Sequence, residues 1–334
     1  MKKLSIGIDI GGINTVFGLV DEKGEFFGES SLSTKNYPAF GDYPKYVKDL
    51  SEALKAMLSG LDFEYEIVGM GIGAPNGNYN NNAIEQPANL WKYSDKDSGK
   101  DEGKRIFYLG NDLKKYMPEI PMFIVTNDAN AATIGEMVFG NAKGLRDFFM
   151  VTLGTGLGSG FVANGEMIYG CDGFAGELGH ITAIVGGRDC GCGKKGCLET
   201  YVSATGIKRT AFEIMAKMRE PSPLRSVSFD DFDSALVSKA AAAGDPVALE
   251  VFRYTGEILG VALANASVIF SPEAIVLFGG AAKAGKLIFE PTKRYMEEHL
   301  LPTFKNQIDL LPSGIEDKNV AVLGAASLIW QKLS

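Results

Sequence analysis

The chain has 334 residues, of which 46% are hydrophobic and 22% charged, so it has the composition of an ordinary globular protein and enough length for two cores. Its net charge of -8, without any block of Lys and Arg, argues against a nucleic-acid-binding surface, and no nucleic-acid partner is expected. No apolar run is long enough to span a membrane, since the best candidate, 258–270, is interrupted by Asn265, and no membrane partner is expected.

The first half of the chain opens with an apolar strand and a glycine turn that leads into a second strand. Apolar residues at helical spacing then predict a helix, and a buried strand runs into a long loop rich in asparagine. A further strand leads directly into a second helix. The expected elements are strands at 4–9, 15–21, 67–73 and 121–126, helices at 44–58 and 129–140, and a loop at 74–91.

The second half repeats the opening pattern, because an apolar strand again ends in a glycine-rich turn and is answered by a strand. Two such hairpins suggest a duplicated α/β architecture with a cleft between the halves, although glycine-turn hairpins also occur in unrelated folds. The expected elements are a strand at 148–154, a long helical stretch at 204–270, a strand at 274–280 and a helix at 319–333.

Three of the four cysteines lie close together, ten positions after one of the two histidines. His180, Cys190, Cys192 and Cys197 offer one imidazole and three thiolates, which is a full tetrahedral set for a structural zinc site. Disulfides are disfavoured in a long chain with no recognisable secretory signal, and inert core thiols would not cluster in a glycine-rich loop. We therefore expect zinc, in a cytoplasmic protein with reduced thiols. Cys171 is left over and is expected to be a small core residue.

Two glycine-rich turns follow strands, at Gly11-Gly12 and at Gly154-Thr155-Gly156. Because glycine has no Cβ, such turns bring backbone N–H groups close to an anion, and Thr155 adds a hydroxyl donor. Asp9, just before the first turn, is placed to hold Mg²⁺ beside phosphates. The alternative for either turn is a tight hairpin without a ligand. No P-loop sequence is present, so a P-loop fold is excluded.

Asn127 and Asp128 follow the strand at 121–126 and open a helix. Either side chain would cap that helix well. A carboxylate at the carboxyl end of a strand also faces the cleft expected of an α/β fold. There it can accept a proton from a substrate hydroxyl as that oxygen attacks a phosphoryl group. The two roles are compatible, because Asn127 can take one and Asp128 the other.

Several side chains suit a polyhydroxylated ligand, because each sugar hydroxyl both donates and accepts hydrogen bonds. Glu177 and Glu199 bracket the cysteine cluster and are not needed as metal ligands. Trp91 would either stack on a sugar face or anchor its loop. The alternative for the asparagines, favoured for 78–82, is a solvated turn region. The loop asparagines are at positions 76, 78, 80, 81, 82 and 89.

Together these motifs resemble the ROK family of bacterial sugar kinases and their repressor relatives. The resemblance spans the chain and implies the two-domain actin-like ATPase (ribonuclease H-like) fold with an interdomain cleft. It also implies ATP-dependent phosphorylation of a hexose hydroxyl, with glucose as the first candidate substrate and its 6-hydroxyl as the first candidate acceptor. The expected domains are 1–126 with 319–334, and 127–318 carrying the zinc loop. The motifs are DIGG at 9–12, NDANAA at 127–132, GTGLGSG at 154–160, ELGH at 177–180, CGCGKKGCLE at 190–199 and FGGAA at 278–282.

The resemblance implies roles residue by residue. Asp128 matches the catalytic base, and His180 would serve zinc with one ring nitrogen and the sugar with the other. ATP, Mg²⁺ and structural Zn²⁺ are the implied cofactors. The sugar-binding positions are Asn89, Asn127, Glu177, His180 and Glu199; the phosphate and magnesium positions are Asp9, Gly11, Gly12, Gly154, Thr155 and Gly156; Gly279 and Gly280 match glycines near the adenosine.

One position departs from the family pattern. The family usually has Thr directly after the two glycines, whereas this chain has Ile13, which cannot donate to phosphate. Asn14, Thr15 or the backbone would have to substitute. The alternatives are a kinase for an N-acetylhexosamine, N-acetylmannosamine or fructose, and a sugar-sensing regulator, which the acidic charge and the early first strand disfavour. A homo-oligomer, either dimer or tetramer, is expected from the family.

Overall fold

The computed structural model describes residues 1–87, 90–92, 105–315 and 319–333, which form two compact units. The first unit comprises Met1–Gly144, Met167–Ala175 and Gly314–Ser334, and the second comprises Leu145–Glu166 and Gly176–Ser313. The division differs from the expected boundary at 126. Helix α3 (Asp128–Phe139) packs along helix α9 (Val320–Leu333) and therefore stays with the first unit.

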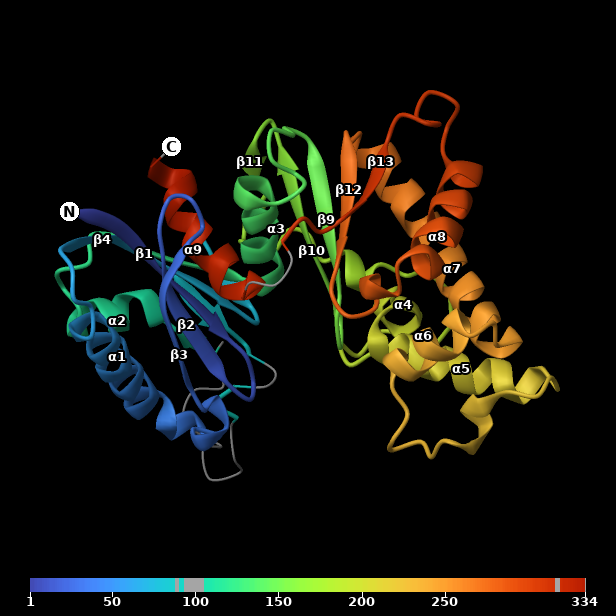
Figure 1. Cartoon of the computed structure of the whole chain (residues 1–334), viewed down its shortest axis with the longest axis horizontal. Coiled ribbons are helices and arrows are strands. Elements are labelled where there is room, and N and C mark those ends of the chain that lie inside the picture. The colour runs from blue at the N-terminus through green and yellow to red at the C-terminus, as the bar shows by residue number, and fades with distance from the viewer. Residues whose placement is uncertain (88–89, 93–104, 316–318, 334) are drawn as a thin grey trace. The chain divides into compact units, whose positions relative to one another are not determined.

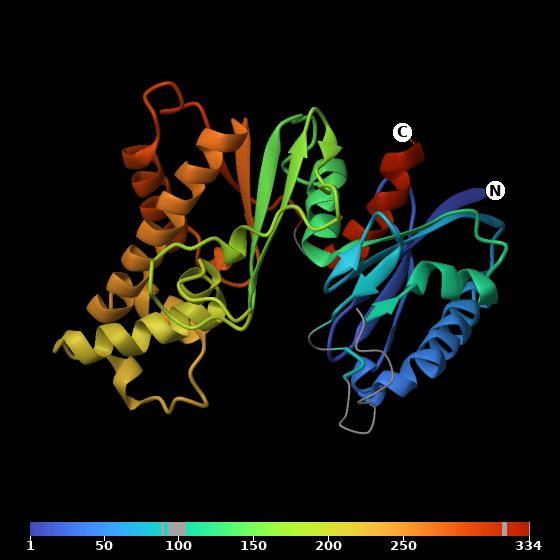
Figure 2. The same ribbon diagram turned by 180° about the vertical axis from the view of Figure 1, so that it is seen from behind.

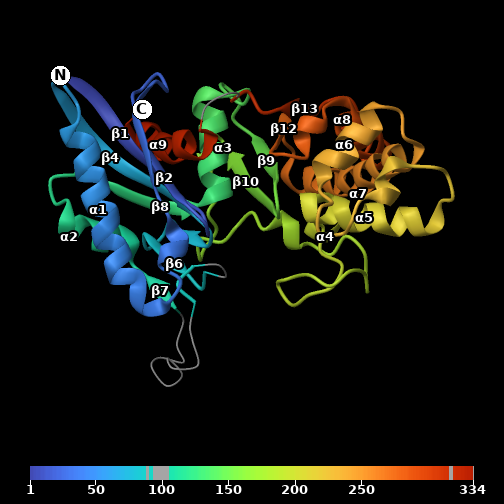
Figure 3. The same ribbon diagram turned by 60° about the horizontal axis from the view of Figure 1, so that its bottom comes forward.

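The first unit is built on a five-stranded sheet with helices on both faces (Figures 1 and 3). Its strands are β1 (Lys2–Ile10), β2 (Thr15–Val20), β3 (Phe26–Leu32), β4 (Tyr65–Ala74) and β8 (Phe123–Asn127), and two further helices are α1 (Tyr43–Ser59) and α2 (Leu109–Tyr116). The order is β3-β2-β1-β4-β8; β1, β2 and β3 are antiparallel, whereas β1, β4 and β8 are parallel. Helices α1 and α2 cover one face, and α3 and α9 the other.

Glycines in the central strands explain why α9 can lie so close to the sheet. A Cβ atom on Gly7 of β1 would collide with the carbonyl oxygen of Val322, and one on Gly71 of β4 with that of Ala325. The backbone of α9 therefore rests directly on the two strands. This contact buries α9 almost completely, from Val322 to Trp330.

The loop expected at 74–91 is partly regular, since β5 (Gly77–Asn78), β6 (Ala83–Glu85) and β7 (Ile106–Phe107) form a three-stranded sheet. Asn78 is buried, and its amide donates to Glu85 Oε1 at 2.9 Å and to Asp172 O at 2.7 Å. Tyr79 stacks on Tyr169 with 3.9 Å between ring centroids. These contacts fasten the segment Met167–Ala175 to the first unit, so Asn78 has a structural role.

The second unit is a second five-stranded sheet with its helices on one side (Figures 1 and 3). Its elements are β9 (Phe148–Leu153), β10 (Leu157–Ala163), β11 (Glu166–Met167), β12 (Ala274–Phe278) and β13 (Asp309–Pro312), with α4 (Glu199–Val202), α5 (Ala204–Lys217), α6 (Ser234–Ala242), α7 (Pro246–Phe270) and α8 (Lys286–His299). Residues 204–270 are thus three α-helices and not one stretch, because Pro221, Pro223 and the Gly244-Asp245-Pro246 turn interrupt the pattern.

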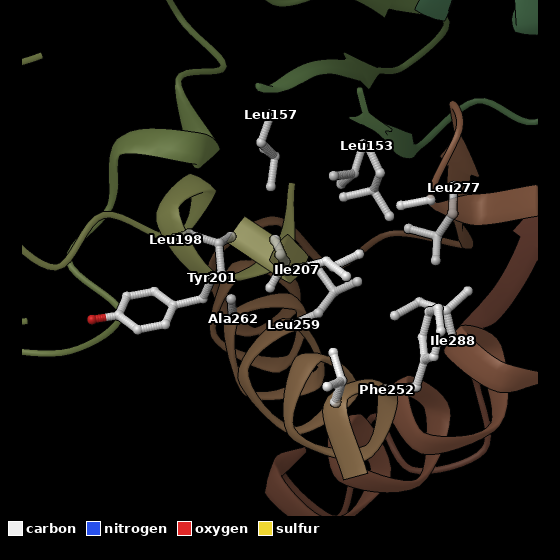
Figure 4. Close-up of a cluster of buried hydrophobic side chains, with 14 of the residues drawn as sticks. Leu153, Leu157, Leu198, Tyr201, Ile207, Phe252, Leu259, Ala262, Leu277 and Ile288 are labelled. Atoms are coloured by element: carbon white, nitrogen blue, oxygen red, sulfur yellow. The ribbon is translucent and has the colours of Figure 1, made fainter. Parts of the chain in front are cut away.

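The core of the second unit lies between its sheet and the long helices. Figure 4 shows Leu153 and Leu277 of the sheet on one side, and Phe252 and Leu259 of α7 on the other. All four side chains are at most 1% exposed. Burial of large apolar side chains of this kind is the main term that stabilises the unit.

The two units share one sheet topology, which confirms the expected duplication. The second order is β11-β10-β9-β12-β13, with β9 and β10 antiparallel and β9, β12 and β13 parallel. In each unit a strand hairpin is therefore followed by two strands parallel to the first. Among the described residues, no helix is both long and apolar enough to cross a bilayer.

Candidate active site

The carboxyl ends of β1, β4 and β8 form one edge of the first sheet, and this edge carries the expected acidic residues. The parallel register places Asp9 opposite Gly73, and Ala74 opposite Asn127. Asp128 follows at once as the first residue of α3. A Cβ on Gly73 would lie 3.6 Å from the Cα of Asp128, so no side chain of β4 stands in the way there. The register therefore brings Asp9 and Asp128 together.

The surroundings of both carboxylates favour the protonated form. Burial, and then the negative charge of Asp128, raise the pKa of Asp9 from 3.8 to about 7. Burial likewise raises the pKa of Asp128, against the opposing effect of backbone N–H groups. The Asp128 side chain is nonetheless exposed to solvent at the start of α3. A carboxylate with a raised pKa that reaches solvent is suited to accept a proton.

Asn127 and Asp128 also perform the capping role that the sequence left open. Asn127 is the N-cap of α3, and its Oδ1 accepts from Ala129 N at 2.8 Å. Asp128 Oδ1 accepts from the same N–H at 2.8 Å. The cap uses only Oδ1 of each side chain, so the other polar atom of Asn127 and of Asp128 is compatible with a second role.

The first glycine turn is exposed and closed by its own backbone. Gly11 N donates to Asn14 O at 2.9 Å, and Lys35 N donates to Ile13 O at 3.1 Å. The side chain of Ile13 is 66% exposed, so the apolar replacement is not needed for packing. The exposed Gly12 completes a turn whose shape does not depend on the side chain at position 13.

Thr15 does not fit its expected phosphate role. Its side chain is fully buried, with Oγ1 2.7 Å from Tyr46 OH and 2.9 Å from Thr34 Oγ1. The hydroxyl is therefore used inside the first unit, where it ties β2 to α1 and to the segment at 34–36. Both hydrogen-bonding partners of the Thr15 hydroxyl are therefore protein groups, and no donor is left for a ligand.

The second unit has a corresponding edge where the parallel strands β9 and β12 end. Gly154 N donates to Gly156 O at 3.0 Å, and Thr155 at the tip is exposed. Gly279 follows β12 with φ +102°, and a Cβ there would lie 2.7 Å from Leu153 O, so only glycine fits. Gly280 is exposed next to it. The turn at 154–156 and the glycines at 279–280 thus lie at one edge.

The start of α5 completes this edge, and sequence reasoning missed it. Ala204 N donates to Gly154 O at 2.8 Å, and Thr205 Oγ1 donates to Thr155 O at 3.0 Å. Ser203 is the N-cap, whose Oγ accepts from Gly206 N at 3.1 Å. The signal in the sequence was a serine directly before a helical pattern, which is typical of a helix start.

The four expected metal ligands come together in the second unit. Their ligand atoms all lie within 4.8 Å of one another. Cys190 Sγ is 3.7 Å from His180 Nδ1, and Cys192 Sγ is 3.7 Å from Cys197 Sγ. All four cysteines of the chain are free thiols. Burial raises the pKa of Cys197 to about 12, so its thiolate would need a cation beside it.

The carboxylates that bracket the cluster are held in different ways. Glu199 opens α4, and its Oε2 accepts from Leu157 N at 2.9 Å while its Oε1 lies 3.8 Å from Cys190 Sγ. Glu177 precedes the short helix Leu178–His180, and its Oε2 lies 3.9 Å from His180 Nε2. His180 therefore turns Nδ1 to the cysteines and Nε2 to Glu177.

Three further expectations have different outcomes. Trp91 is 1% exposed and packs against Tyr43 and Phe107 with ring centroids 4.8 and 4.7 Å away, so it anchors its loop. Cys171 is exposed and is not a core residue, because it lies on the surface of the segment Met167–Ala175. Asn89 lies outside the described residues.

The sequence and the structure are both similar to known proteins. A profile of the ROK family matches residues 5–332. The glucokinase of Halalkalibacterium halodurans is 35% identical over 98% of this chain and 95% of its own length. The structure of a ROK family glucokinase from Streptomyces griseus, in complex with glucose and AMPPNP, has a TM-score of 0.75 and 29% identity, and the match covers 97% of this chain and 98% of that one.

A regulatory protein is also similar in structure. A ROK family transcriptional regulator, a homologue of the Escherichia coli MLC protein, has a TM-score of 0.84 and 26% identity, and the match covers 100% of this chain and 79% of that one. These likenesses confirm the expected fold class, the actin-like ATPase fold.

Proposed function

The chain belongs to the ROK family, and on this premise we propose that it transfers a phosphoryl group from ATP to a hydroxyl of a hexose. The observation that carries the proposal is the pairing of Asp9 and Asp128 at the carboxyl edge of β1 and β8. Phosphoryl transfer needs a base at the attacking hydroxyl and a cation at the phosphates, and two neighbouring carboxylates supply groups for both.

In the proposed reaction Asp128 accepts the proton of the attacking sugar hydroxyl. Its raised pKa matches the task, because a base must hold the proton it removes near neutral pH. Asp9 is a hard oxygen donor and fits Mg²⁺, whose chemistry is to offset the charge of the nucleotide phosphates. The N–H groups of Gly11 and Gly154 bond within their own turns, so the exposed Gly12 and Thr155 would offer backbone N–H groups to those phosphates. Gly279 lets the chain turn close to Leu153, and the open space beside Gly280 leaves room for the nucleoside.

We propose zinc at His180, Cys190, Cys192 and Cys197. Ligands at about 2.0–2.3 Å from a tetrahedral zinc lie about 3.4–3.8 Å apart. Two of the donor pairs are separated by 3.7 Å, and all four donor atoms lie within 4.8 Å of one another. Four protein ligands leave no open position, so the ion would be structural. By holding Nδ1 of His180, it would orient Nε2 and the neighbouring Glu177 toward a sugar hydroxyl.

Glucose is the first candidate sugar, since two relatives that match nearly the whole chain are named glucokinases. Asn127, Glu177, His180 and Glu199 are the proposed hydrogen-bond partners of its hydroxyls. N-acetylhexosamines, N-acetylmannosamine and fructose are the alternatives. The likeness to a ROK family regulator favours sugar sensing as a second candidate function.

The test is release of ADP from Mg-ATP with each of these sugars, for the wild type and for Asp128→Asn. The variant should keep its fold and its sugar binding, whereas kcat should fall by on the order of 10² to 10⁴, as expected for a lost general base. Asp62→Asn, at an exposed site between α1 and β4, is the control. Near wild-type kcat in Asp128→Asn would refute the assignment. Sugar binding without turnover in the wild type would favour sensing.

A further inference from the structure

Arg188 lies in the loop between His180 and the cysteines, and its guanidinium is fully bonded. The side chain is 7% exposed. Nε and Nη2 donate to the two oxygens of Glu213 at 2.8 and 2.7 Å, and Nη2 also donates to Thr210 Oγ1 at 2.9 Å. Nη1 donates to Thr200 O at 2.6 Å and to Gly206 O at 3.2 Å. All five N–H groups of the guanidinium thus have acceptors.

The backbone of Arg188 is held as firmly as its side chain. Its N–H donates to Tyr201 OH at 2.9 Å, and its carbonyl accepts from Gly196 N at 2.8 Å. The guanidinium also stacks on the Tyr201 ring, 4.4 Å from the centroid. Figure 4 shows Tyr201 extending from α4, away from Leu259 and Ile288, with its hydroxyl at the outer end.

The acceptors of Arg188 lie on α4 and α5, two consecutive helices joined at Ser203. The Thr200 carbonyl follows Glu199 directly, and Gly206 lies in the first turn of α5. The same two helices also bond the turn at 154–157. Leu157 N donates to Glu199 Oε2, and Ala204 N donates to Gly154 O. One side chain therefore fastens the cysteine loop to the element that carries a proposed sugar ligand.

We propose that Arg188 is a positioning residue, which holds Glu199 in place for the sugar and gives the zinc loop a second attachment besides the metal. The proposal rests on the proposed function. Arginine is required because the planar fork bonds the Glu213 carboxylate in a bidentate manner while it reaches two carbonyls, and lysine cannot reproduce this geometry.

The expected effect is stronger on the sugar than on the nucleotide. The Thr200 carbonyl is bonded next to Glu199, whereas the turn at 154–156 keeps its own backbone bond between Gly154 and Gly156. Arg188→Met should therefore raise the KM for the best sugar by about tenfold or more, and leave the KM for ATP within about threefold. Arg188→Lys should resemble Arg188→Met.

The control is Arg209→Met, because Arg209 bonds the same loop by a single contact, Nη1 to Asp189 O at 3.0 Å. Both constants should stay within about threefold there. Equal rises in the two KM values for Arg188→Met, or no rise in a folded variant, would show a general structural role and overturn the proposal. If Arg188→Met does not fold, Glu213→Gln decides, since its side chain is 49% exposed; it should raise the sugar KM alone, and an unchanged sugar KM would overturn the proposal.

A second measurement does not depend on catalysis. In the zinc-loaded protein, Arg188→Met should speed the removal of Zn²⁺ by a chelator by about tenfold, because the loop has lost the side-chain bonds that tie it to α4 and α5. An unchanged rate would refute the second attachment. If the wild type releases no ADP with any of the sugars tested, the proposed function is refuted. The rate of zinc removal by the chelator would still decide the role of Arg188.

Discussion

Asp9→Asn should stabilise the nucleotide-free protein at alkaline pH, although it removes a proposed ligand of Mg²⁺. The pKa of Asp9 is raised from 3.8 to about 7, so the folded state holds this proton more tightly than the unfolded state does. Stability from this group is therefore full below about pH 4 and is lost as the pH rises through about 7. Asparagine carries no charge at any pH, so the variant does not lose this stability as the pH rises.

The magnitude follows from the shift of about three pKa units. Each unit corresponds to about 1.4 kcal/mol, so the limiting difference between variant and wild type at pH 8 is about 4 kcal/mol. Asp9 is half-buried, and water that reaches it reduces this to on the order of 1–3 kcal/mol. Part of the shift comes from Asp128, whose own pKa is raised, so the two carboxylates titrate as a pair.

The assay is thermal unfolding followed by circular dichroism from pH 5 to pH 8.5, without nucleotide or Mg²⁺ and without a chelator, so that bound zinc is kept. The advantage of Asp9→Asn over the wild type should grow by several degrees between pH 5 and pH 8, while Asp62→Asn shows no such trend. A difference between Asp9→Asn and wild type that does not change with pH would refute the reasoning.

Three shorter predictions concern the turn and the metal. Thr15→Val should lower the free energy of unfolding by about 1–3 kcal/mol, because Tyr46 OH loses a buried partner, and the KM for ATP should stay within about threefold; a large KM effect would restore Thr15 to the phosphate site. Cys192→Ser should lower the zinc content, measured by elemental analysis, and raise the sugar KM; wild-type protein without zinc near one per chain would contradict the site. Ile13→Thr should change the KM for ATP by less than about fivefold, because the backbone shapes the turn; a gain of about tenfold or more in kcat/KM would show that a needed hydroxyl is missing.

The fold was predictable where the sequence pattern is local. Strands β1, β4, β9 and β12 are rich in apolar residues, and the hairpin that opens each unit has glycine at its turn. The domain boundary was not predictable in this way. It depends on α3 packing along α9, and these helices are far apart in the sequence. The helical stretch is broken locally, because Pro221, Pro223 and Gly244 lie between α5, α6 and α7.

The candidate site was predictable to a similar extent, and for the same reason. His180 and the cysteines lie within eighteen positions, from 180 to 197, so spacing alone indicated a metal site. Thr15 could not be placed, because its hydroxyl partners are Tyr46 and Thr34, which only the folded chain brings near. The bonds of Arg188 are likewise invisible in the sequence, since its acceptors lie between 200 and 213 with no motif around them.

The repeated topology explains how two chemically different edges arise from one backbone plan. In both units a hairpin is followed by strands parallel to the first, so their carboxyl ends meet at one edge. The first unit fills that edge with Asp9 and Asp128, which can bind a cation or take a proton. At the strand ends of the second unit stand the turn at 154–156 and Gly279-Gly280, where backbone N–H groups suit an anion. Phosphoryl transfer requires both kinds of group: in the proposed reaction the first unit supplies the carboxylates, and the glycine turns of both units supply backbone N–H groups.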